Sequence, residues 1–210
     1  MTWKNDQQWE SEWWGSCVNT FNEEYKQLLY ARLMGLSPQK TPWRDPEYDL
    51  NGKSVIDIGG GPVSMLLKSV NFSKAIVVDP CNYPQWVKQR YNEAGIDYYR
   101  MSGEDLLDES KMIFDKVDEV WIYNVLQHTK DPEKIIKNAK TLAKTIRIFE
   151  WVDTRVTIGH PHVLKKENLD KWLDGPGKVE FLDKNNCYGK AYFGVFNYRW
   201  TINGKPLQEI

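Results

Sequence analysis

Three consecutive glycines, Gly59–Gly61, stand directly after an apolar run, Ser54–Ile58. That run is rich in β-branched side chains, which is typical of a parallel strand buried on both faces. Glycines let the backbone turn tightly and let a ligand approach main-chain N–H groups. A second run, Ala75–Val78, ends at Asp79, where a carboxylate can accept both hydroxyls of a ribose. Strand, glycine turn, strand and acid together predict one nucleoside-binding half of an α/β sheet.

Apolar runs and helical patterns continue to alternate as far as residue 149. The sequence predicts further strands at Asp97–Met101, Glu119–Tyr123 and Thr145–Phe149, and helices at Val63–Val70, Tyr83–Ala94 and Pro132–Ala143. The last of these helices has a favourable start, because proline suits the first helical position. This alternation indicates an open, mostly parallel sheet covered by helices on both faces.

The pattern changes near the C-terminus, where two strand-like runs follow each other without a helix between them. A short helix is predicted at Glu167–Leu173, and the two runs are Val179–Leu182 and Ala191–Trp200. Residues 183–190, which join the runs, are rich in turn formers. Strands joined in this way pair antiparallel. We therefore expect a Rossmann-like three-layer α/β sandwich, with a seven-stranded, mostly parallel sheet that ends in a C-terminal antiparallel hairpin.

The first fifty residues differ from the rest. Glu23–Leu36 has the apolar spacing of an amphipathic helix, and the proline-containing stretch after it predicts a connecting loop. Trp9, Trp13 and Trp14 have helix-like spacing and predict a buried lid contact, with a ligand platform as the alternative. We therefore divide the chain into an N-terminal helical extension or lid, residues 1–50, and a main domain, residues 51–210.

Composition excludes several classes of protein. Lys and Arg number 28 and Asp and Glu 29, so the near-neutral charge argues against a broad nucleic-acid-binding face. Cys17, Cys81 and Cys187 are too scattered for a disulfide scaffold or a zinc site. The polar first fifteen residues lack the apolar core of a signal peptide, and no apolar run is long enough to span a membrane. We expect a cytoplasmic protein without a membrane partner; its oligomeric state stays open.

Four landmarks at predicted strand ends resemble those of the class I S-adenosylmethionine-dependent methyltransferases, over roughly residues 50–200. They are Asp57-x-Gly59-x-Gly61, Asp79, the segment Ser102–Leu106, and Tyr123–His128 followed by Asp131-Pro132. The resemblance implies S-adenosylmethionine as methyl donor. It implies donor contacts at Asp57, Gly59, Gly60, Gly61, Asp79, Pro80, Ser102, Gly103, Glu104, Tyr123 and Asn124. The chain departs from the family pattern at Val63, where a third glycine is common.

Two other functions use similar motifs. A nicotinamide-dependent oxidoreductase needs G-x-G-x-x-G, but the third glycine position is Ser64 here. The acid before the glycines and the antiparallel end of the sheet also favour methyl transfer. A protein that binds the donor without catalysis, as a partner or regulatory subunit, would carry the same donor motifs.

The acceptor side is predicted from the histidines and from the end of the fifth strand. A hydroxyl acceptor needs a base, and His128, His160 and His162 are the candidate catalytic residues. His128 follows the fourth strand, where the alternative is a histidine bonded to backbone. If the segment of His160 and His162 is extended, both rings point to one side, where they could also bind an acceptor. Glu150 and Trp151 end the fifth strand and are further candidates for acceptor binding.

A metal is not predicted, since two histidines alone do not make a metal site. A third ligand, Glu150 or Asp153, would be needed at His160 and His162. Residues 123–126 lack the N/D-P-P-Y/F element of methyltransferases that modify exocyclic amino groups of nucleic acids. The sequence therefore favours O-methylation of a small-molecule or sugar hydroxyl.

Overall fold

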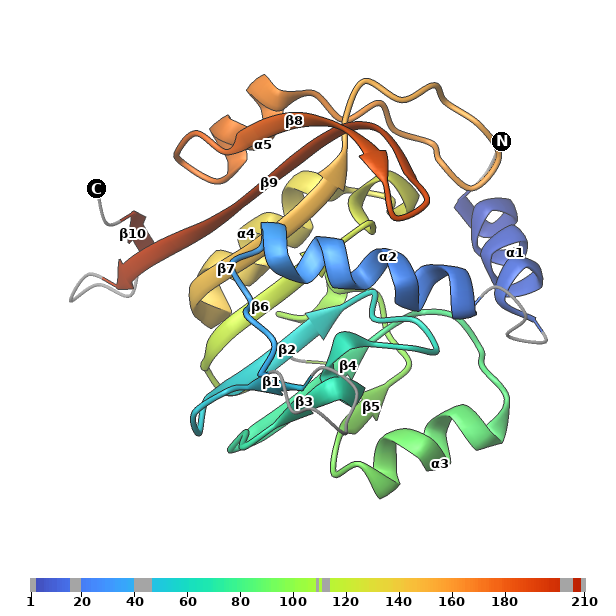
Figure 1. Ribbon diagram of the computed structural model, residues 1–210, viewed down its shortest axis with the longest axis vertical. Coiled ribbons are helices and arrows are strands. Elements are labelled where there is room, and N and C mark those ends of the chain that lie inside the picture. The colour runs from blue at the N-terminus through green and yellow to red at the C-terminus, as the bar shows by residue number, and fades with distance from the viewer. Residues whose placement is uncertain are drawn as a thin grey trace.

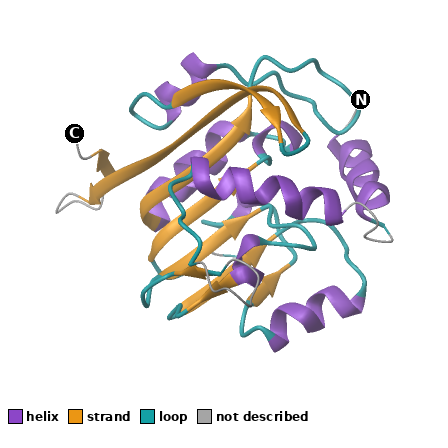
Figure 2. Ribbon diagram, viewed as in Figure 1, coloured by secondary structure: helices purple, strands orange, loops and turns teal. Residues whose placement is uncertain are grey.

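An eight-stranded sheet forms the middle layer of the protein (Figures 1 and 2). The computed structural model describes residues 3–15, 20–39, 47–108, 110, 114–200 and 206–208. From one edge the strands are β5 (Asp97–Tyr99), β4 (Lys74–Val78), β2 (Ser54–Ile58), β6 (Val117–Tyr123), β7 (Ala143–Trp151) and β9 (Cys187–Trp200). Strand β9 also pairs with β8 (Lys178–Lys184) and with β10 (Pro206–Gln208). Two short strands, β1 (Tyr48–Asp49) and β3 (Ser69–Val70), form a separate parallel pair.

The first five strands of this sheet are parallel, as the sequence predicts. The chain runs outward from β2 to β4 and β5, then crosses back to β6 and β7 on the other side. In open α/β sheets, ligands bind outside the carboxyl ends of the strands where the order reverses in this way. The sheet therefore places a crevice beside the ends of β2 and β6.

The predicted C-terminal antiparallel hairpin is confirmed, but its turn is shorter than the sequence suggested. Strands β8 and β9 are joined by Asn185 and Asn186 alone, both with left-handed φ angles of 54° and 57°. Asparagine tolerates this conformation, which the preferred two-residue hairpin turns require. Since the two asparagines complete the reversal, Cys187–Lys190 pairs with β8 instead of forming part of a loop. Strand β10 is an addition to the seven strands predicted.

Helices cover both faces of the sheet. Helix α2 (Thr20–Leu33) lies across one face (Figure 1), where Leu29 and Tyr30 join a core cluster that also includes residues of α3 (Gln85–Glu93). Helices α4 (Pro132–Leu142) and α5 (Lys166–Trp172) pack on the opposite cluster. Neighbouring strand residues divide between the two clusters, as the twofold alternation of a strand requires. The sequence predicted four helices that begin at residues 23, 83, 132 and 167, and these four helices confirm them.

The helix predicted at Val63–Val70 is wrong. The structure has only a 3₁₀ turn, η1 (Met65–Lys68), and then β3, which pairs with β1. The hydroxyl of Ser64 accepts a hydrogen bond from the N–H of Leu66 and so caps this turn. Helix α2 covers the face above η1 instead, and Gln27 of α2 donates a hydrogen bond to the carbonyl of Val63. Helix α2 therefore shares with α3 the cover of this face, where the segment between β2 and β4 forms no helix of its own.

No helix in the part of the chain that the structure describes is both long and apolar enough to cross a membrane.

We expect Leu29→Ala to lower the free energy of unfolding by about 2–5 kcal/mol, because Leu29 is 3% exposed in the core beneath α2. Urea unfolding followed by circular dichroism measures this change. Tyr25→Ala on the same helix is the control, since Tyr25 is 44% exposed and its loss should change stability by about 0.5 kcal/mol or less. Equal effects of the two substitutions would contradict a core role for α2.

Candidate active site

A cavity of about 320 Å³ opens at the carboxyl ends of the central strands. The glycine loop after β2, the residues after β4 and the end of β6 line one part of it. Trp151 at the end of β7, the turn η3 (Leu126–His128) and His160 line another part. Helices α1 (Trp3–Trp14) and α2 supply the remaining wall. The cavity is therefore placed where the sheet topology predicts a ligand site.

The loop Gly59–Gly61 needs its glycines for two reasons. Gly59 and Gly61 have left-handed φ angles of 73° and 63°, which side chains rarely adopt. A Cβ on Gly59 would lie 2.6 Å from a methyl carbon of Val125, so the loop packs directly on the chain after β6. Near Gly61 a Cβ would meet only the hydroxyl of Tyr83, at 3.9 Å. The loop thus presents bare backbone to the cavity.

Asp79 lies beside this loop at the end of β4. Its carboxylate accepts hydrogen bonds from the N–H groups of Gly61 at 3.0 Å and of Cys81 at 2.9 Å. Burial raises the pKa of Asp79, although these hydrogen bonds oppose the shift. Pro80 and Tyr83 line the cavity next to it. The acid is therefore held by backbone at the cavity wall.

Glu150 fixes the turn that carries His128. The Glu150 carboxylate is fully buried and accepts hydrogen bonds from the N–H groups of Val125 and Leu126 at 3.0 Å. Burial raises the pKa of Glu150 to about 7. Glu150 does not line the cavity, so its place differs from the acceptor contact that the sequence suggested. Its contacts hold η3, and with it His128, against the end of β7.

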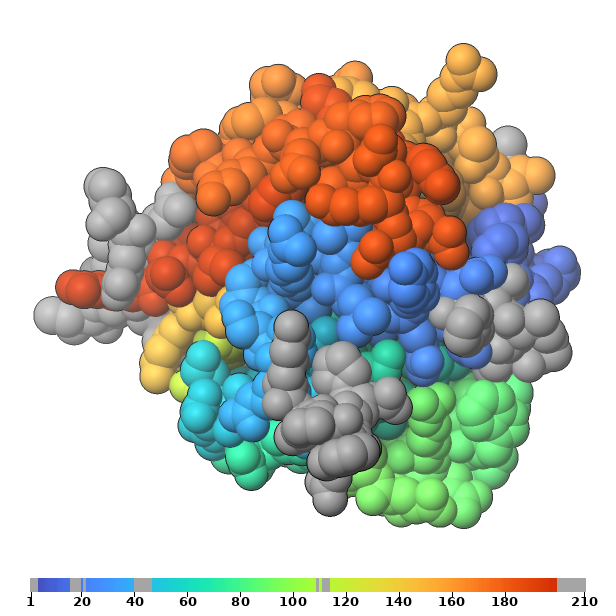
Figure 3. Space-filling view, viewed as in Figure 1, coloured from blue at the N-terminus to red at the C-terminus, as the bar shows by residue number. Residues whose placement is uncertain are grey.

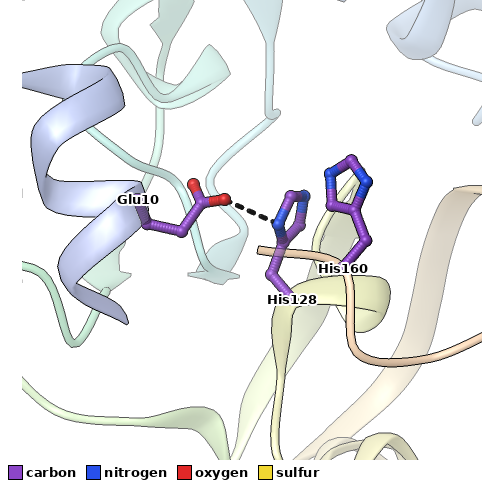
Figure 4. Close-up of side chains that lie close together, drawn as sticks. All are labelled: Glu10, His128 and His160. Carbon is purple, nitrogen blue, oxygen red and sulfur yellow. Dashed lines mark ion pairs between the residues drawn. The ribbon is translucent and has the colours of Figure 1, made fainter. Parts of the chain in front are cut away.

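His128 lies beside Glu10 and His160 on the cavity wall (Figure 4). Its Nδ1 is 2.8 Å from the carbonyl oxygen of Gly159 and 2.8 Å from a carboxylate oxygen of Glu10. The rings of His128 and His160 meet edge to face, with centroids 4.4 Å apart. Burial alone would lower the pKa of His128, but the Glu10 carboxylate outweighs it and the pKa is raised. Burial and the neighbouring His128 lower the pKa of His160.

His160 and His162 are not brought together at this wall. Thr157 and His160 exchange two backbone hydrogen bonds across a turn in which Gly159 has a φ of 83°. The chain therefore turns just before His160, and the Nδ1 of His160 lies 3.2 Å from the hydroxyl of Thr157. The Nε2 of His162 instead lies 2.9 Å from the carbonyl oxygen of Thr129, and His162 does not line the cavity.

The comparisons with known proteins agree with this geometry. Residues 56–145 match the family model described as a methyltransferase domain. All four landmarks of the resemblance lie in this segment, and the segment is similar to the methyltransferase domains of the class I S-adenosylmethionine-dependent family. The resemblance seen in the sequence is thereby confirmed.

A curated relative is the ubiquinone biosynthesis O-methyltransferase of Pseudomonas syringae pv. tomato, 27% identical over 119 residues. The match covers 55% of this chain and 50% of the relative, so the chain spans about half the length of the curated relatives it matches.

Two solved structures share the fold. N-methyltransferase NodS from Bradyrhizobium japonicum, in complex with S-adenosyl-L-homocysteine, has a TM-score of 0.55 at 13% identity and covers 83% of this chain and 85% of its own. A possible histamine N-methyltransferase from Thermotoga maritima has a TM-score of 0.56 at 12% identity, and the match covers 91% of this chain and 92% of the other chain. At these identities the likeness concerns the fold alone.

Several residues implied as donor contacts line the cavity of this protein, and others do not. The lining residues among them are Gly59, Gly60, Gly61, Asp79, Pro80, Tyr123 and Asn124. Asp57, Ser102, Gly103 and Glu104 do not line it. Glu104 instead accepts hydrogen bonds from the N–H groups of Lys130 and Asp131, which ties the turn η2 (Gly103–Asp105) to the start of α4.

Asp57 lies beneath the glycine loop. Its carboxylate accepts hydrogen bonds of 2.5 Å from the hydroxyls of Ser64 and Tyr123. A Cβ on Gly60 would lie 2.7 Å from the same carboxylate. Burial raises the pKa of Asp57 to about 7, although the two hydroxyls oppose the shift. Asp57 therefore shapes the loop from below instead of contacting a ligand in the cavity.

The sequence missed the residues that the N-terminal helices contribute. Helix α1 brings Trp9, Trp13 and Trp14 to the cavity, as the helical spacing suggested, but also Glu10. The Trp9 ring packs on Gly159, whose N–H donates a hydrogen bond to Asp6. In Figure 3 the α1 residues sit against the segment that follows β7. Only the composition of α1 pointed to this helix; no motif linked Glu10 to the histidines.

Asp57→Asn tests the buried carboxylate through the pH dependence of stability. Because the pKa of Asp57 is raised on folding, the native state binds more protons between pH 4 and 7, and stability falls as pH rises through that window. The neighbouring Asp79 carboxylate adds to this shift. For the wild type we expect the free energy of unfolding to fall by about 4 kcal/mol across this window, and for the variant we expect this fall to be absent. Urea unfolding from pH 4 to 8 measures both profiles.

Asp118→Asn is the control. The backbone N–H of Ser54 lowers the pKa of Asp118, so the stability that this carboxylate contributes is lost only as pH falls below the usual value of 3.8, and its removal should leave the fall between pH 4 and 8 in place. An unchanged pH profile in Asp57→Asn would contradict the raised pKa of that group.

Proposed function

We propose that the protein transfers a methyl group from S-adenosylmethionine to a hydroxyl of a small-molecule or sugar acceptor. One observation carries this proposal: the glycine loop and Asp79 line the same cavity as Trp151, His128 and His160. Groups suited to a nucleoside and groups suited to an acceptor thus face one space. Its volume of about 320 Å³ is in the range of small-molecule sites.

The donor fits the part of the cavity between the glycine loop and Asp79. A carboxylate at the end of the second parallel strand suits the two ribose hydroxyls. Helix α2 places Glu23 and Lys26 on the cavity wall, 3.2 Å apart, where they can pair with the amino and carboxylate groups of a methionine moiety. Asp79, Glu10 and Glu23 also give the cavity several acidic groups, which suits a donor with a positive sulfonium. Contacts from Ser102–Glu104 to the adenine stay a prediction.

The transfer itself needs positioning and a place for one proton. A bond forms between the acceptor oxygen and the methyl carbon, while the carbon–sulfur bond breaks and its electron pair returns to sulfur. The hydroxyl proton leaves at the wall formed by His128 and His160. Holding donor and acceptor in line contributes up to roughly 7–11 kcal/mol in favourable cases. Helix α1, acting as a lid, would exclude water that competes with the acceptor.

The preference for a hydroxyl acceptor has two supports. Curated relatives are named O-methyltransferases, although the match spans half their length. Two imidazoles on the acceptor side of the cavity provide groups that can accept the proton of a hydroxyl. Trp151, half-buried at the end of β7, gives that side an apolar wall for a ring-shaped acceptor.

Asp79→Asn tests the donor site. Losing a charged acceptor of two hydroxyl hydrogen bonds should weaken binding of S-adenosylhomocysteine roughly ten- to hundredfold, measured by isothermal titration calorimetry. Asp97→Asn at the exposed start of β5 should keep the wild-type affinity. Wild-type affinity in Asp79→Asn would remove Asp79 from the donor site.

Histidine variants test the acceptor site and separate catalysis from donor binding alone. With labelled donor and a panel of phenolic and sugar acceptors, His128→Ala and His160→Ala should lose at least tenfold in turnover while keeping their affinity for S-adenosylhomocysteine. His162→Ala should retain most turnover, because its ring contacts the Thr129 carbonyl and does not itself line the cavity. Donor binding without methyl release to any acceptor in the panel would favour a regulatory, non-catalytic protein.

A further inference from the structure

Three side chains from distant parts of the chain meet on the acceptor side of the cavity. Glu10 comes from α1, His128 from η3 and His160 from the loop after β7 (Figure 4). Each offers one ligand atom, and these atoms all lie within 4.8 Å of one another. Two imidazoles and one carboxylate form a donor set that divalent transition metals bind.

Both imidazoles have one nitrogen engaged and the other available. The Nδ1 of His128 lies 2.8 Å from the Gly159 carbonyl oxygen, which fixes the proton on Nδ1 in the neutral ring. The Nδ1 of His160 lies 3.2 Å from the hydroxyl of Thr157. Histidines that bind metals almost always use their second nitrogen in this way, because such a contact fixes the ring and its tautomer. The Nε2 of His160 is left to bind an ion, and that of His128 can do so once the Gln127 amide nitrogen, 3.2 Å away, turns from it.

Two buried oxygens beside the rings have no hydrogen-bond donor. Glu10 is 9% exposed and Gln127 is 3% exposed, and the Oε1 atom of each is unpartnered. Glu10 Oε1 is close to Nδ1 of His128, but the one hydrogen of that nitrogen is directed at Gly159. The Gln127 amide nitrogen lies 3.2 Å from Nε2 of His128 and donates a hydrogen bond to Oδ1 of Asn124 at 3.0 Å, so a turn that brought the amide oxygen to the ring would replace that hydrogen bond. Buried oxygens without a donor are costly, and a cation at the ring would satisfy that of Glu10 directly and that of Gln127 after this turn.

We infer that Glu10, His128 and His160 bind a divalent transition-metal ion, with the amide oxygen of Gln127 as a further neutral ligand. Nitrogen ligands favour zinc, cobalt, manganese or iron over magnesium and calcium, which prefer oxygen. The site has one feature that the sequence does not reveal: its carboxylate comes from helix α1, so the ion would fasten this helix to the rest of the cavity.

The inference deepens the proposed function and, for its consequence, rests on it. An ion at this wall would bind the acceptor oxygen and lower the pKa of its hydroxyl, so the proton would pass to solvent water before helix α1 closes and before the carbon–oxygen bond forms. The two histidines would then act as ligands. Binding of the ion itself does not require that the proposed reaction be correct, and it can be measured without turnover.

Cobalt titration tests the site. Chelator-treated protein without a histidine tag should bind one Co²⁺ per chain, with visible absorption bands and a saturable calorimetric signal. Glu10→Gln and His160→Ala should each weaken Co²⁺ binding at least tenfold, because even residues that only orient ligands change affinity by about 10–100-fold. Glu12→Gln, on the exposed side of α1, should keep the wild-type affinity. Circular dichroism and melting temperature verify that each variant is folded.

Three results would overturn the inference: no saturable binding, binding that Glu10→Gln and His160→Ala leave unchanged, or equal loss in Glu12→Gln. An ion pair between Glu10 and a protonated His128 would give the first of these. S-adenosylhomocysteine binding, measured on the same samples, separates this failure from failure of the proposed function. Donor binding without Co²⁺ binding rejects the metal site alone, and Co²⁺ binding without donor binding rejects the proposed function alone.

Discussion

The carboxylate of Asp57 is the interaction on which the cavity depends. It holds Ser64 at the start of η1 and Tyr123 at the end of β6, and it lies directly under Gly60. The Tyr123 hydroxyl in turn accepts a hydrogen bond from the N–H of Met65. One fully buried acid thus connects two strands and the loop between them, at the place where the sheet order reverses. The hydroxyls of Ser64 and Tyr123 offset part of the energetic cost of burying this acid, whose other oxygen has no hydrogen-bond partner.

The N-terminal helices complete a domain that is otherwise missing one layer. After β2 the chain forms one 3₁₀ turn, so the segment between β2 and β4 cannot cover its own face of the sheet. Helix α2 covers that face, and the stacking of Tyr30 on Phe149 at 4.0 Å anchors it to β7. Because α2 also lines the cavity, the layer that stabilises the sheet and the wall that meets the ligand are the same helix. Residues 1–50 are thus part of both the core and the site.

The sequence predicted most of the fold because its signals are local. Runs of β-branched residues predicted the strands, and the glycines with Asp79 predicted that a ligand binds at the carboxyl ends of the strands. The Val63–Val70 helix failed because the apolar Met65–Leu67 run fits a helix and a buried turn equally well, and pairing of β3 with β1 decided between them. The role of Asp57 was misjudged for a related reason: spacing places an acid before the glycines but does not tell whether it points into the cavity or under the loop. No signal in the sequence pointed to Glu10, because its partners His128 and His160 lie in distant segments.

The position of Glu10 gives the N-terminal helix a chemical role as well as a covering one. Tryptophans alone would make α1 a passive lid, held by contacts such as that of Trp9 on Gly159. Glu10 adds a charged group that is buried only while α1 stays closed over His128 and His160. In the lid role that we propose for α1, opening of the helix would expose that carboxylate to water and separate it from the imidazoles, so closure and assembly of the cavity wall would be one event. Such a lid would complete the site only when water is excluded, which is the condition that transfer from a reactive sulfonium requires.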